Sequence, residues 1–352
     1  MILKQVQYDK NKKQKVKKNK FSDFKKIVSK AKNISILTHT NPDGDAMGSS
    51  LGLYHYLLKK KKNVKVIIPN KFPGFLEWMP AAKQALVFDE NMAKTQKQIE
   101  KSDLLFILDF NNYSRLDKLG EFLNHSKAPK VLIDHHRQPD TCFDFYFHDE
   151  HASSTAELVY DFICGIDSQK MIDKKTATCL FTGIMTDTGT FRFPGTTEKT
   201  FHIAASLVKA GANNATIYNN IYDDYSSQRL KLLGYCLSEK LVFLPEYKTA
   251  YIAISEEELK RFDFKKGDTE GIVNQALSVR GIKFSAFFSE REGEIRISFR
   301  SQGKFDVNKF ARAHFGGGGH VNAAGGKSVT SLEATVNKFL SILPEYKSDL
   351  VK

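Results

Sequence analysis

The sequence predicts an α/β protein: a doubly wound, mainly parallel sheet, then a smaller α/β domain, with a cleft between the two. Three observations favour this class. A chain of 352 residues is long enough for two domains that each bury a core. From residue 21 to about 205, short apolar runs alternate with segments of helical periodicity, as in parallel sheets. Beyond residue 232, apolar runs occur in pairs around turns, which is typical of hairpins.

In the first part, four apolar runs predict buried strands. They are ISILT (34–38), VKVIIP (64–69), LLFILDF (104–110) and KVLID (130–134). Apolar residues at helical spacing predict the helices between and after them, at residues 21–32, 46–60, 155–164, 174–186 and 198–210. We expect the last of these helices to end at Gly211 as its C-cap.

The domain boundaries follow from where these patterns change. Residues 1–20 form a lysine-rich tail, and residues 21–211 form the first domain. Residues 212–232 are polar and rich in tyrosine, which predicts a linker with some helix. In residues 233–345, the segments KLVFL-PEYK-TAYIAIS and IKFSAFF-SEREG-EIRISFRS predict two hairpins, and SLEATVNKFLSIL predicts a last helix.

Composition and charge narrow the class of protein. With 41% apolar and 26% charged residues, the chain is an ordinary globular sequence. No apolar run approaches the roughly 18–20 residues that span a bilayer, and the N-terminus lacks the apolar stretch of a secretory signal. We therefore expect a cytoplasmic location. The tail supplies +7 of the net charge of +13, and the milder surplus elsewhere is compatible with a phosphate-bearing ligand.

The four cysteines are far apart in the sequence and form no CxxC pair. They are Cys142, Cys164, Cys179 and Cys236. In a reducing compartment this pattern predicts buried free thiols.

Histidine and aspartate residues follow the predicted strands. They are His39, Asp43 and Asp45 after the first strand, Asp109 in the third, Asp134, His135 and His136 at the fourth, and Asp187 after a later helix. Ligands of parallel sheets bind beyond the carboxyl ends of the strands, so we expect these side chains at one sheet edge. Carboxylates at close range raise one another's pKa, and a pair of divalent cations removes this cost. Imidazole and carboxylate ligands suit Mn²⁺, and two such ions about 3.5–4 Å apart hydrolyse phosphoesters.

Each of these residues also has a simpler interpretation when it is taken alone. His39 could be a capped or surface histidine, and Asp43 and Asp45 could form a turn and a helix N-cap. We favour a metal site because all of these residues occur together at the predicted sheet edge. We expect Gly44 to let the loop turn between ligands, whereas a helix start and tight packing explain the GSS that follows.

Four motifs resemble those of the DHH phosphoesterase superfamily. They are HTNPDGD (39–45), LDF (108–110), DHH (134–136) and TDTGTF (186–191). In the second domain, FRS (299–301) and GGGGHVNAAG (316–325) resemble the DHH-associated C-terminal domain. The resemblance covers nearly all of the chain except the tail.

The resemblance implies two Mn²⁺ ions and a set of ligands for each. One ion would be held by His39, Asp43 and Asp109, and the other by Asp45, Asp109, His135 and Asp187. A hydroxide activated by both metals would attack the phosphorus. His136 would contact the substrate phosphate or assist the leaving group, and Asp134 would orient ligands. The catalytic residues that the resemblance implies are therefore His136, Asp134 and the bridging Asp109.

In the second domain the candidate residues are an arginine and a glycine run. Alternation along residues 294–300 places Ile295, Ile297 and Phe299 on one face and Arg296 and Arg300 on the other. Taken alone, Arg300 could be a surface cation and the glycine run a flexible loop. The resemblance assigns nucleotide binding to Arg300, Ser301, Gly317, Gly318, Gly319 and His320. Closure across the cleft would then measure substrate length.

Within the superfamily, the chain resembles the short, stand-alone members. It lacks the signature of the pyrophosphatase C-terminal domain, and RecJ-like chains are longer. The resemblance implies an Mn²⁺-dependent phosphoesterase for short oligoribonucleotides (nanoRNA), linear dinucleotides such as pApA, and 3′-phosphoadenosine 5′-phosphate (pAp). The alternatives are a noncatalytic RNA-binding protein and a cyclic-dinucleotide phosphodiesterase. We expect short single-stranded RNA and nucleotides as partners and no membrane, and we allow for a homodimer.

Overall fold

The computed structural model describes residues 20–116, 118–223 and 225–351. This part of the chain divides into two compact units after Asp223. The division lies within residues 212–232, which the sequence indicated as a linker. The predicted tail lies outside the described residues except for Lys20. The predicted domain boundaries and the cleft stay predictions.

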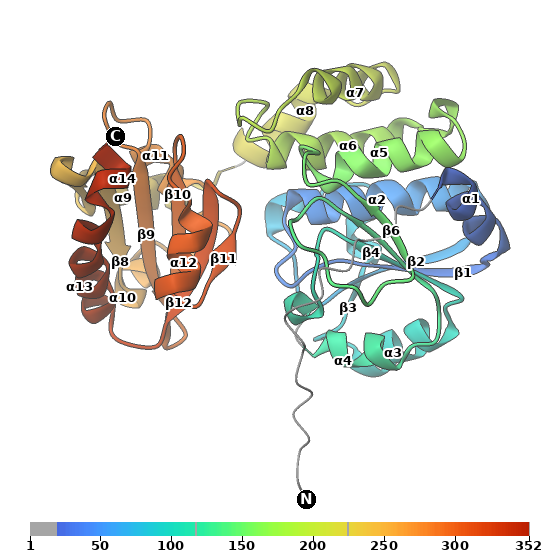
Figure 1. Cartoon of the computed structure of the whole chain (residues 1–352), viewed down its shortest axis with the longest axis horizontal. Helices are drawn as coiled ribbons and strands as arrows, with labels where there is room; N and C mark the ends of the chain where they lie inside the picture. The colour runs from blue at the N-terminus through green and yellow to red at the C-terminus, as the bar shows by residue number, and fades with distance from the viewer. Residues whose placement is uncertain (1–19, 117, 224, 352) are drawn as a thin grey trace, which may run out of the picture. The chain divides into compact units, whose positions relative to one another are not determined.

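The first unit is built on a parallel sheet (Figure 1). Its strands are β1 (Asn33–Leu37), β2 (Asn63–Ile68), β3 (Leu86–Val87), β4 (Leu104–Leu108), β5 (Lys130–Asp134) and β6 (Phe145–His148). They lie in the order β3-β2-β1-β4-β5-β6, and every pair is parallel. The four predicted strands are confirmed to within two residues. The strand order reverses between β1 and β4, which is where ligands bind in doubly wound sheets.

Helices cover both faces of this sheet, which confirms the predicted doubly wound α/β class (Figure 1). The helices of this unit are α1 (Phe21–Lys30), α2 (Gly44–Lys59), α3 (Met92–Lys101), α4 (Leu119–His125), α5 (Thr155–Ile166), α6 (Lys174–Asp187), α7 (Glu198–Lys209) and α8 (Asn214–Tyr218). Strand β4 illustrates the two cores, because Phe106 packs in the core with α2, α5 and α6, whereas Ile107 packs with α3 and α4. The C-cap of α7 is Ala210 rather than the predicted Gly211; Gly211 comes next, with φ +108°, in the left-handed position that ends the helix.

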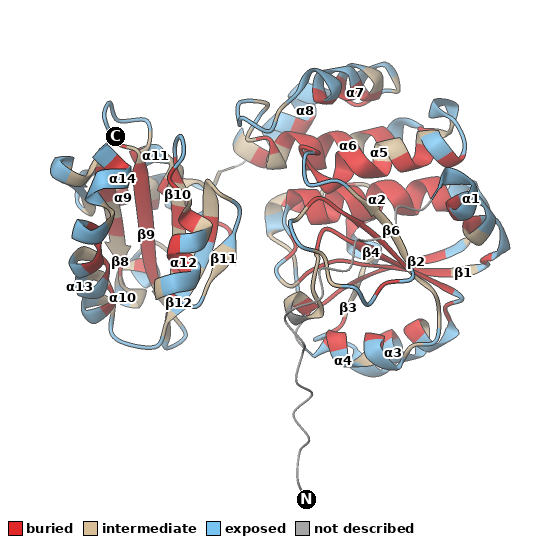
Figure 2. Ribbon diagram, viewed as in Figure 1, coloured by how far each residue is buried: buried red, intermediate tan, exposed pale blue. Residues whose placement is uncertain are grey.

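Helix α2 is the central helix of the first unit. It is buried at 14 of its 16 residues, and Figure 2 shows it buried along nearly its whole length. It packs against both α5 and α6, so it is covered on the side away from the sheet as well. This burial explains why the sequence between Gly44 and Leu57 has few charges: the Asp45 carboxylate and His55 are the exceptions.

The role that we expected for Gly44 is wrong. Gly44 is the first residue of α2 and has no left-handed backbone. A Cβ atom at this position would overlap the side chain of Thr186 in α6. The left-handed residue of the loop is instead Asn41, with φ +55°. Gly44 therefore permits the close approach of two helices, and the turn is made two residues before Asp43.

The second unit holds a mixed six-stranded sheet. Its strands are β7 (Leu241–Leu244), β8 (Thr249–Ile254), β9 (Phe284–Arg291), β10 (Glu294–Ser301), β11 (Gly318–Gly319) and β12 (Ala323–Ser328), in the order β11-β12-β10-β9-β8-β7. The β8–β9 pair is parallel and the other described pairs are antiparallel. Both predicted hairpins are confirmed. The second turn is tighter than SEREG: Glu292 and Gly293 make it, with φ +52° and +80°.

Helices lie against this sheet as well. They are α9 (Ser227–Ser238), α10 (Glu256–Arg261), α11 (Ile272–Ala276), α12 (Val307–His314), α13 (Leu332–Ile342) and α14 (Lys347–Val351). One core is dominated by phenylalanine: the ring of Phe284 lies 5.2 Å from that of Phe310 and 5.7 Å from that of Phe339. On β10, Ile295, Ile297 and Phe299 are buried as the alternation predicted.

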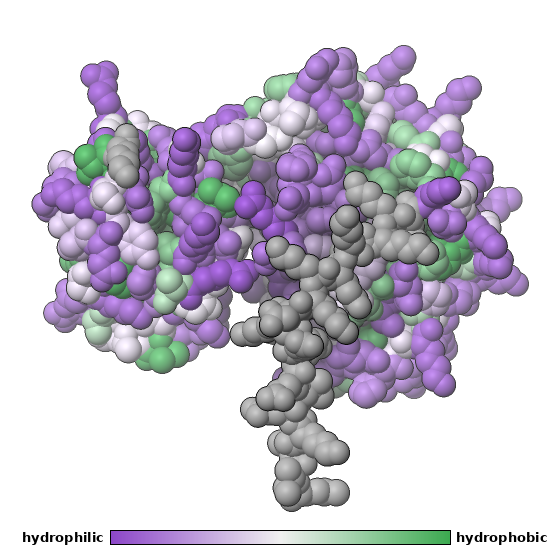
Figure 3. Space-filling model, in the orientation of Figure 1, coloured by the Kyte–Doolittle hydropathy of each residue, from purple (hydrophilic) through white to green (hydrophobic). Residues whose placement is uncertain are grey.

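The surface is mostly hydrophilic on the face that Figure 3 shows, with apolar residues in scattered patches. Among the described residues, no helix combines the length and the apolar character needed to cross a bilayer. All four cysteines are free, as predicted, but only Cys179 and Cys236 are buried. Cys142 is exposed and Cys164 half-buried, so the expectation of burial is wrong for these two.

We expect Glu258→Gln to lower the stability of the second unit at neutral pH. Burial raises the pKa of Glu258, but hydrogen bonds from Lys240 and the Ser255 N–H outweigh it and lower the pKa to about 2. Because the folded pKa lies below the ordinary value of 4.5, this stabilisation is present above pH 4.5 and is lost as the pH falls towards 2. Because the side chain is partly exposed and solvent screens its contacts, the substitution should cost about 1–2 kcal/mol near pH 7.

Chemical denaturation between pH 7 and pH 2 tests this expectation. Glu257→Gln is the matched control, because Glu257 is exposed and neighbours Glu258 on the same helix. Equal unfolding free energies for the two variants at pH 7 would contradict the stabilising role of the half-buried Glu258 carboxylate.

Candidate metal centre

The predicted ligands of the first unit meet at the carboxyl ends of three adjacent strands. His39 follows β1, Asp109 follows β4, and His135 and His136 follow β5. Helices bring the others: Asp43 is the N-cap of α2, Asp45 lies in its first turn, and Asp187 is the last residue of α6. All six residues that the sequence predicted as metal ligands are therefore brought to the edge where the strand order reverses.

Asp109 lies at the centre of this group. Its Oδ2 is 3.4 Å from His39 Nε2, and its Oδ1 is 3.6 Å from His135 Nε2. The residue is 2% exposed and has a left-handed backbone, with φ +63°. Aspartate and asparagine adopt this conformation more readily than other non-glycine residues. Each carboxylate oxygen of Asp109 thus faces a different histidine, as a bridging ligand would require.

The ligand atoms fall into two triads. Those of His39, Asp43 and Asp109 lie within 4.8 Å of one another, as do those of Asp45, His135 and Asp187. Among the described residues, several groups of histidine and carboxylate atoms are close enough together to hold a metal ion, and these two triads are among them. Asp43 is also the N-cap of α2, which was the simpler interpretation of this residue. Its Oδ1 accepts from the N–H groups of Asp45 and Ala46.

The hydrogen bonds of the two histidines fit a cation between them and the carboxylates. His39 Nδ1 lies 2.9 Å from the carbonyl of Thr40, and His135 Nδ1 lies 3.2 Å from that of Ala152. A carbonyl only accepts, so each Nδ1 carries the proton and each Nε2 presents a lone pair. In His39, this buried Nε2 has no hydrogen-bond partner among the described residues and faces the Asp109 carboxylate. Two acceptors face each other there, an arrangement that a bound metal ion stabilises.

The carboxylates also indicate a need for positive charge. Burial, reinforced by the negative charge of Asp109, raises the pKa of Asp45 well above its usual range. Burial also raises the pKa of Asp187 to about 6, partly opposed by His135. The pKa of Asp109 moves the other way: burial raises it, but the neighbouring His39, His136 and His135 outweigh burial and lower it below its usual range. A divalent cation would hold all three in the charged form.

The start of helix α5 holds the carboxylates in place, and sequence reasoning missed it. Thr155 N and Ala156 N donate to the two oxygens of Asp45 at 2.6 and 2.9 Å. The Thr155 hydroxyl donates to Asp109 Oδ1 at 2.9 Å. Ser154 caps the helix through the N–H of Glu157. The serines and threonine before an apolar helix were the available signal, because such a start presents N–H groups to an anion.

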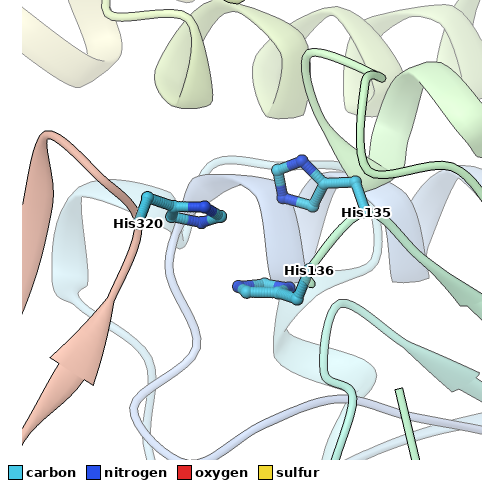
Figure 4. A group of neighbouring side chains, drawn as sticks. All are labelled: His135, His136 and His320. Atoms are coloured by element: carbon cyan, nitrogen blue, oxygen red, sulfur yellow. The ribbon is translucent and has the colours of Figure 1, made fainter. Parts of the chain in front are cut away.

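Asp134 orients His136 rather than His135. The Asp134 carboxylate is 0% exposed, and its Oδ1 accepts from His136 Nδ1 at 2.7 Å. The opposite nitrogen of His136, Nε2, accepts from Arg115 Nη1 at 3.0 Å. Figure 4 shows the rings of His135 and His136 after β5, and their centroids are 4.9 Å apart. Sequence reasoning missed Arg115, which follows β4 in the short helix η3 (Tyr113–Leu116) without any motif that marks it.

The predicted substrate residues belong to the second unit. Arg300 is half-buried on β10, and its Nη1 donates to the carbonyl of Phe299. Ser301 faces the opposite side of the strand and is buried; its hydroxyl donates to the carbonyl of Phe305 and accepts from Asn322. The structure therefore places these two side chains on different faces of β10. Their roles stay predictions.

The glycine run is required by close packing of the backbone. A Cβ atom at Gly317 would overlap the carbonyl of Gly325, and one at Gly319, with φ +156°, would overlap that of Ala323. Gly318 pairs with Gly325 between β11 and β12. His320, which Figure 4 also labels, follows β11, and its N–H donates to Ala323 O at 2.7 Å.

Comparison with known proteins identifies the family. The family model described as "DHH family, N-terminal domain" matches residues 33–184, and the "DHHA1 domain" matches residues 246–348. A relative from Streptococcus mutans, named probable bifunctional oligoribonuclease and PAP phosphatase NrnA, is 31% identical over 316 residues, which are 88% of this chain and 95% of the relative. The chain belongs to the DHH family. The resemblance seen in the motifs and the predicted enzyme class, a phosphoesterase hydrolase, are thereby confirmed.

Two further proteins that this chain is similar to bear on the fold and on the alternatives. A crystal structure of an exopolyphosphatase-related protein from Bacteroides fragilis is 40% identical, with a TM-score of 0.91 over 94% of this chain and 97% of that one. The cyclic-di-AMP phosphodiesterase PdeA of Listeria monocytogenes is 26% identical over 324 residues, which cover 88% of this chain but 47% of that protein.

Proposed function

We propose that this DHH-family protein is an Mn²⁺-dependent phosphoesterase that hydrolyses short oligoribonucleotides, linear dinucleotides such as pApA, and pAp. The observation that carries the proposal is the pair of His/Asp triads around the buried Asp109. The name of the Streptococcus mutans relative, an oligoribonuclease and PAP phosphatase, supports the choice of substrates. A cytoplasmic location and a homodimer stay predictions.

The proposed ligand sets are those that the motifs implied. His39, Asp43 and Asp109 would hold one Mn²⁺ ion, and Asp45, Asp109, His135 and Asp187 the other. When bound, such a pair of ions activates water and neutralises charge on phosphoryl oxygens. The chain's own contribution is to fix the ligands before substrate arrives, through the Thr40 and Ala152 carbonyls and the start of α5.

His136 is the proposed residue for the substrate phosphate or the leaving group. Its Nδ1 proton is committed to the buried Asp134 carboxylate, which sets the orientation of the ring. Its Nε2, which accepts from Arg115 Nη1 at 3.0 Å, is the atom proposed to act on a substrate oxygen. In the second unit, Arg300, Ser301, the glycines 317–319 and His320 are proposed to bind the nucleotide. Among the described residues, no carboxylate oxygen lies within 4.0 Å of the Arg300 guanidinium, which supports an anionic ligand.

A comparison of hydrolysis rates tests the proposed substrates. Purified protein with Mn²⁺ is given pAp, pApA, a five-nucleotide RNA, an RNA of some two dozen nucleotides, and cyclic di-AMP in parallel. We expect the first three to be hydrolysed fastest. A preference for the long RNA would contradict the proposal.

The same assay separates the proposal from a second candidate. The similarity to PdeA of Listeria monocytogenes favours cyclic dinucleotides as an alternative substrate class. Faster hydrolysis of cyclic di-AMP than of pApA would favour that candidate. The other alternative, a noncatalytic RNA-binding protein, does not agree with the enzyme class of the family.

We expect Thr155→Val to weaken metal binding while leaving the fold intact. The change removes the hydroxyl that donates to Asp109 Oδ1 and keeps the branched shape of a buried side chain. Losing a partner that orients a ligand costs metal affinity about 10–100-fold. Titration of Mn²⁺ into metal-free protein measures the loss. Thr182→Val is the control, since the buried Thr182 donates to a carbonyl within α6 instead. Equal Mn²⁺ affinities of the two variants would refute the orienting role.

A further inference from the structure

Arg115 is tied to both sides of the candidate metal centre. Its carbonyl accepts from the N–H of Thr40, the residue after His39, at 2.8 Å. Its guanidinium donates from Nη1 to His136 Nε2 at 3.0 Å. The backbone and the side chain of one residue thus connect the loop after β1 to the loop after β5.

The Arg115 guanidinium lies near five carboxylates but forms no ion pair with any of them. Asp43, Asp45, Asp109, Asp134 and Asp187 surround the centre, yet within the described ranges no carboxylate oxygen lies within 4.0 Å of Arg115 nitrogen atoms. Its side-chain partner is the lone pair of an imidazole nitrogen. Arginine remains protonated at all ordinary pH values, so this positive charge is held without a neutralising partner.

The side chain is also accessible. Arg115 is half-buried, whereas Asp109 and Asp134 beside it are almost completely buried. A guanidinium has five N–H donors in a planar fork, and one of them serves His136. The remaining donors match two oxygens of a phosphoryl group, which is the anion that a phosphoesterase must bind.

We propose that Arg115 binds the phosphoryl oxygens of the substrate at the metal centre, and that the Asp134–His136 pair holds its guanidinium in position. This inference rests on the proposed function for the identity of the ligand as a phosphoester. The carboxylate orients the imidazole, the imidazole accepts from the guanidinium, and the guanidinium presents its other donors to the phosphate. The role is one of binding, so it concerns affinity for the substrate and for phosphate more than the maximal rate.

Arg115→Gln in the full-length, Mn²⁺-loaded protein tests the inference, with inorganic phosphate and AMP as probes. We expect the inhibition constants of both probes against pApA hydrolysis to rise about 10–100-fold, the usual effect of losing charged hydrogen bonds to an anion. KM should rise by a similar factor, with a smaller change in kcat. Arg137→Gln is the matched control, because Arg137 follows His136 directly but is exposed and points to Glu150.

Making the Arg115 substitution in a His136→Gln variant separates direct binding of phosphate by Arg115 from an effect of Arg115 on His136. In His136→Gln, the new amide can still donate to Asp134, so the buried carboxylate keeps a partner. Adding Arg115→Gln to this background should weaken phosphate binding again, by a smaller factor because His136 no longer positions the guanidinium, and calorimetry measures this loss. If the second change is silent, or if Arg115→Gln alone leaves the phosphate constants unchanged, the inference is wrong.

The outcome is distinguishable from failure of the proposed function. If the wild-type protein hydrolyses none of the nucleotides but loses phosphate binding in Arg115→Gln, the proposed substrates fail and the phosphate contact stands. If the wild-type protein hydrolyses pApA and Arg115→Gln matches it in KM and in both inhibition constants, the inference fails alone.

Discussion

Asp109→Asn is expected to reduce hydrolysis of pApA by at least about 10³-fold while the protein stays folded. Asp109 faces His39 with one oxygen and His135 with the other, and it is the proposed bridge between the two metal positions. An amide supplies one weak oxygen ligand in place of two charged ones. Metal affinity and turnover should therefore fall together.

Asparagine is a better replacement than alanine at this position. Residue 109 has φ +63°, a conformation that asparagine tolerates and alanine does not favour. Asp263→Asn provides the control, since Asp263 also has a left-handed backbone, with φ +47°, and is exposed in the second unit. Thermal unfolding should give similar melting temperatures for both variants. Near-wild-type turnover by folded Asp109→Asn would refute the proposed bridge.

Gly48→Ala is expected to lower the free energy of unfolding by about 1–3 kcal/mol, because α2 and α6 touch at this residue. A Cβ atom would lie 2.6 Å from the carbonyl oxygen of Cys179 and 2.7 Å from the nitrogen of Gly183. Both are backbone atoms, so the helices must separate. Since α2 carries Asp45 and α6 carries Asp187, Mn²⁺ affinity should fall as well.

A glycine-to-alanine substitution at a helix position with no neighbouring atoms should raise the free energy of unfolding instead of lowering it. Gly234 lies within α9, and a Cβ atom there would meet nothing within 4 Å. Gly234→Ala should therefore stabilise the protein by about 0.5–1 kcal/mol, as alanine does in a helix interior. Chemical denaturation of both variants measures the difference. Equal effects at the two positions would contradict the close contact between α2 and α6.

The sequence predicted the strands and the ligand positions because both depend on local patterns. The four long apolar runs are strands, and the residues that follow them are at the edge where parallel strands end. Strand β3, only Leu86–Val87, is too short to have a period, and the half-buried β6 lacks a clear apolar face. These two edge strands depend on pairing with β2 and β5.

What could not be predicted depends on contacts between distant segments. Thr155 reaches Asp45 and Asp109 across 110 and 46 residues of sequence, and Arg115 reaches His136 across 21. Neither belongs to a motif that we could recognise. Gly44 was recognised but given the wrong reason, because the side chain of Thr186 that excludes a Cβ atom belongs to another helix. Tertiary packing supplies these residues with their roles.

The most direct test of the account is the release of AMP from pApA by metal-free protein to which Mn²⁺ is added stepwise. We predict no release in excess chelator, recovery as Mn²⁺ is added, and two ions bound per chain at full activity. Unchanged AMP release by wild-type protein that is kept free of metal would contradict the account.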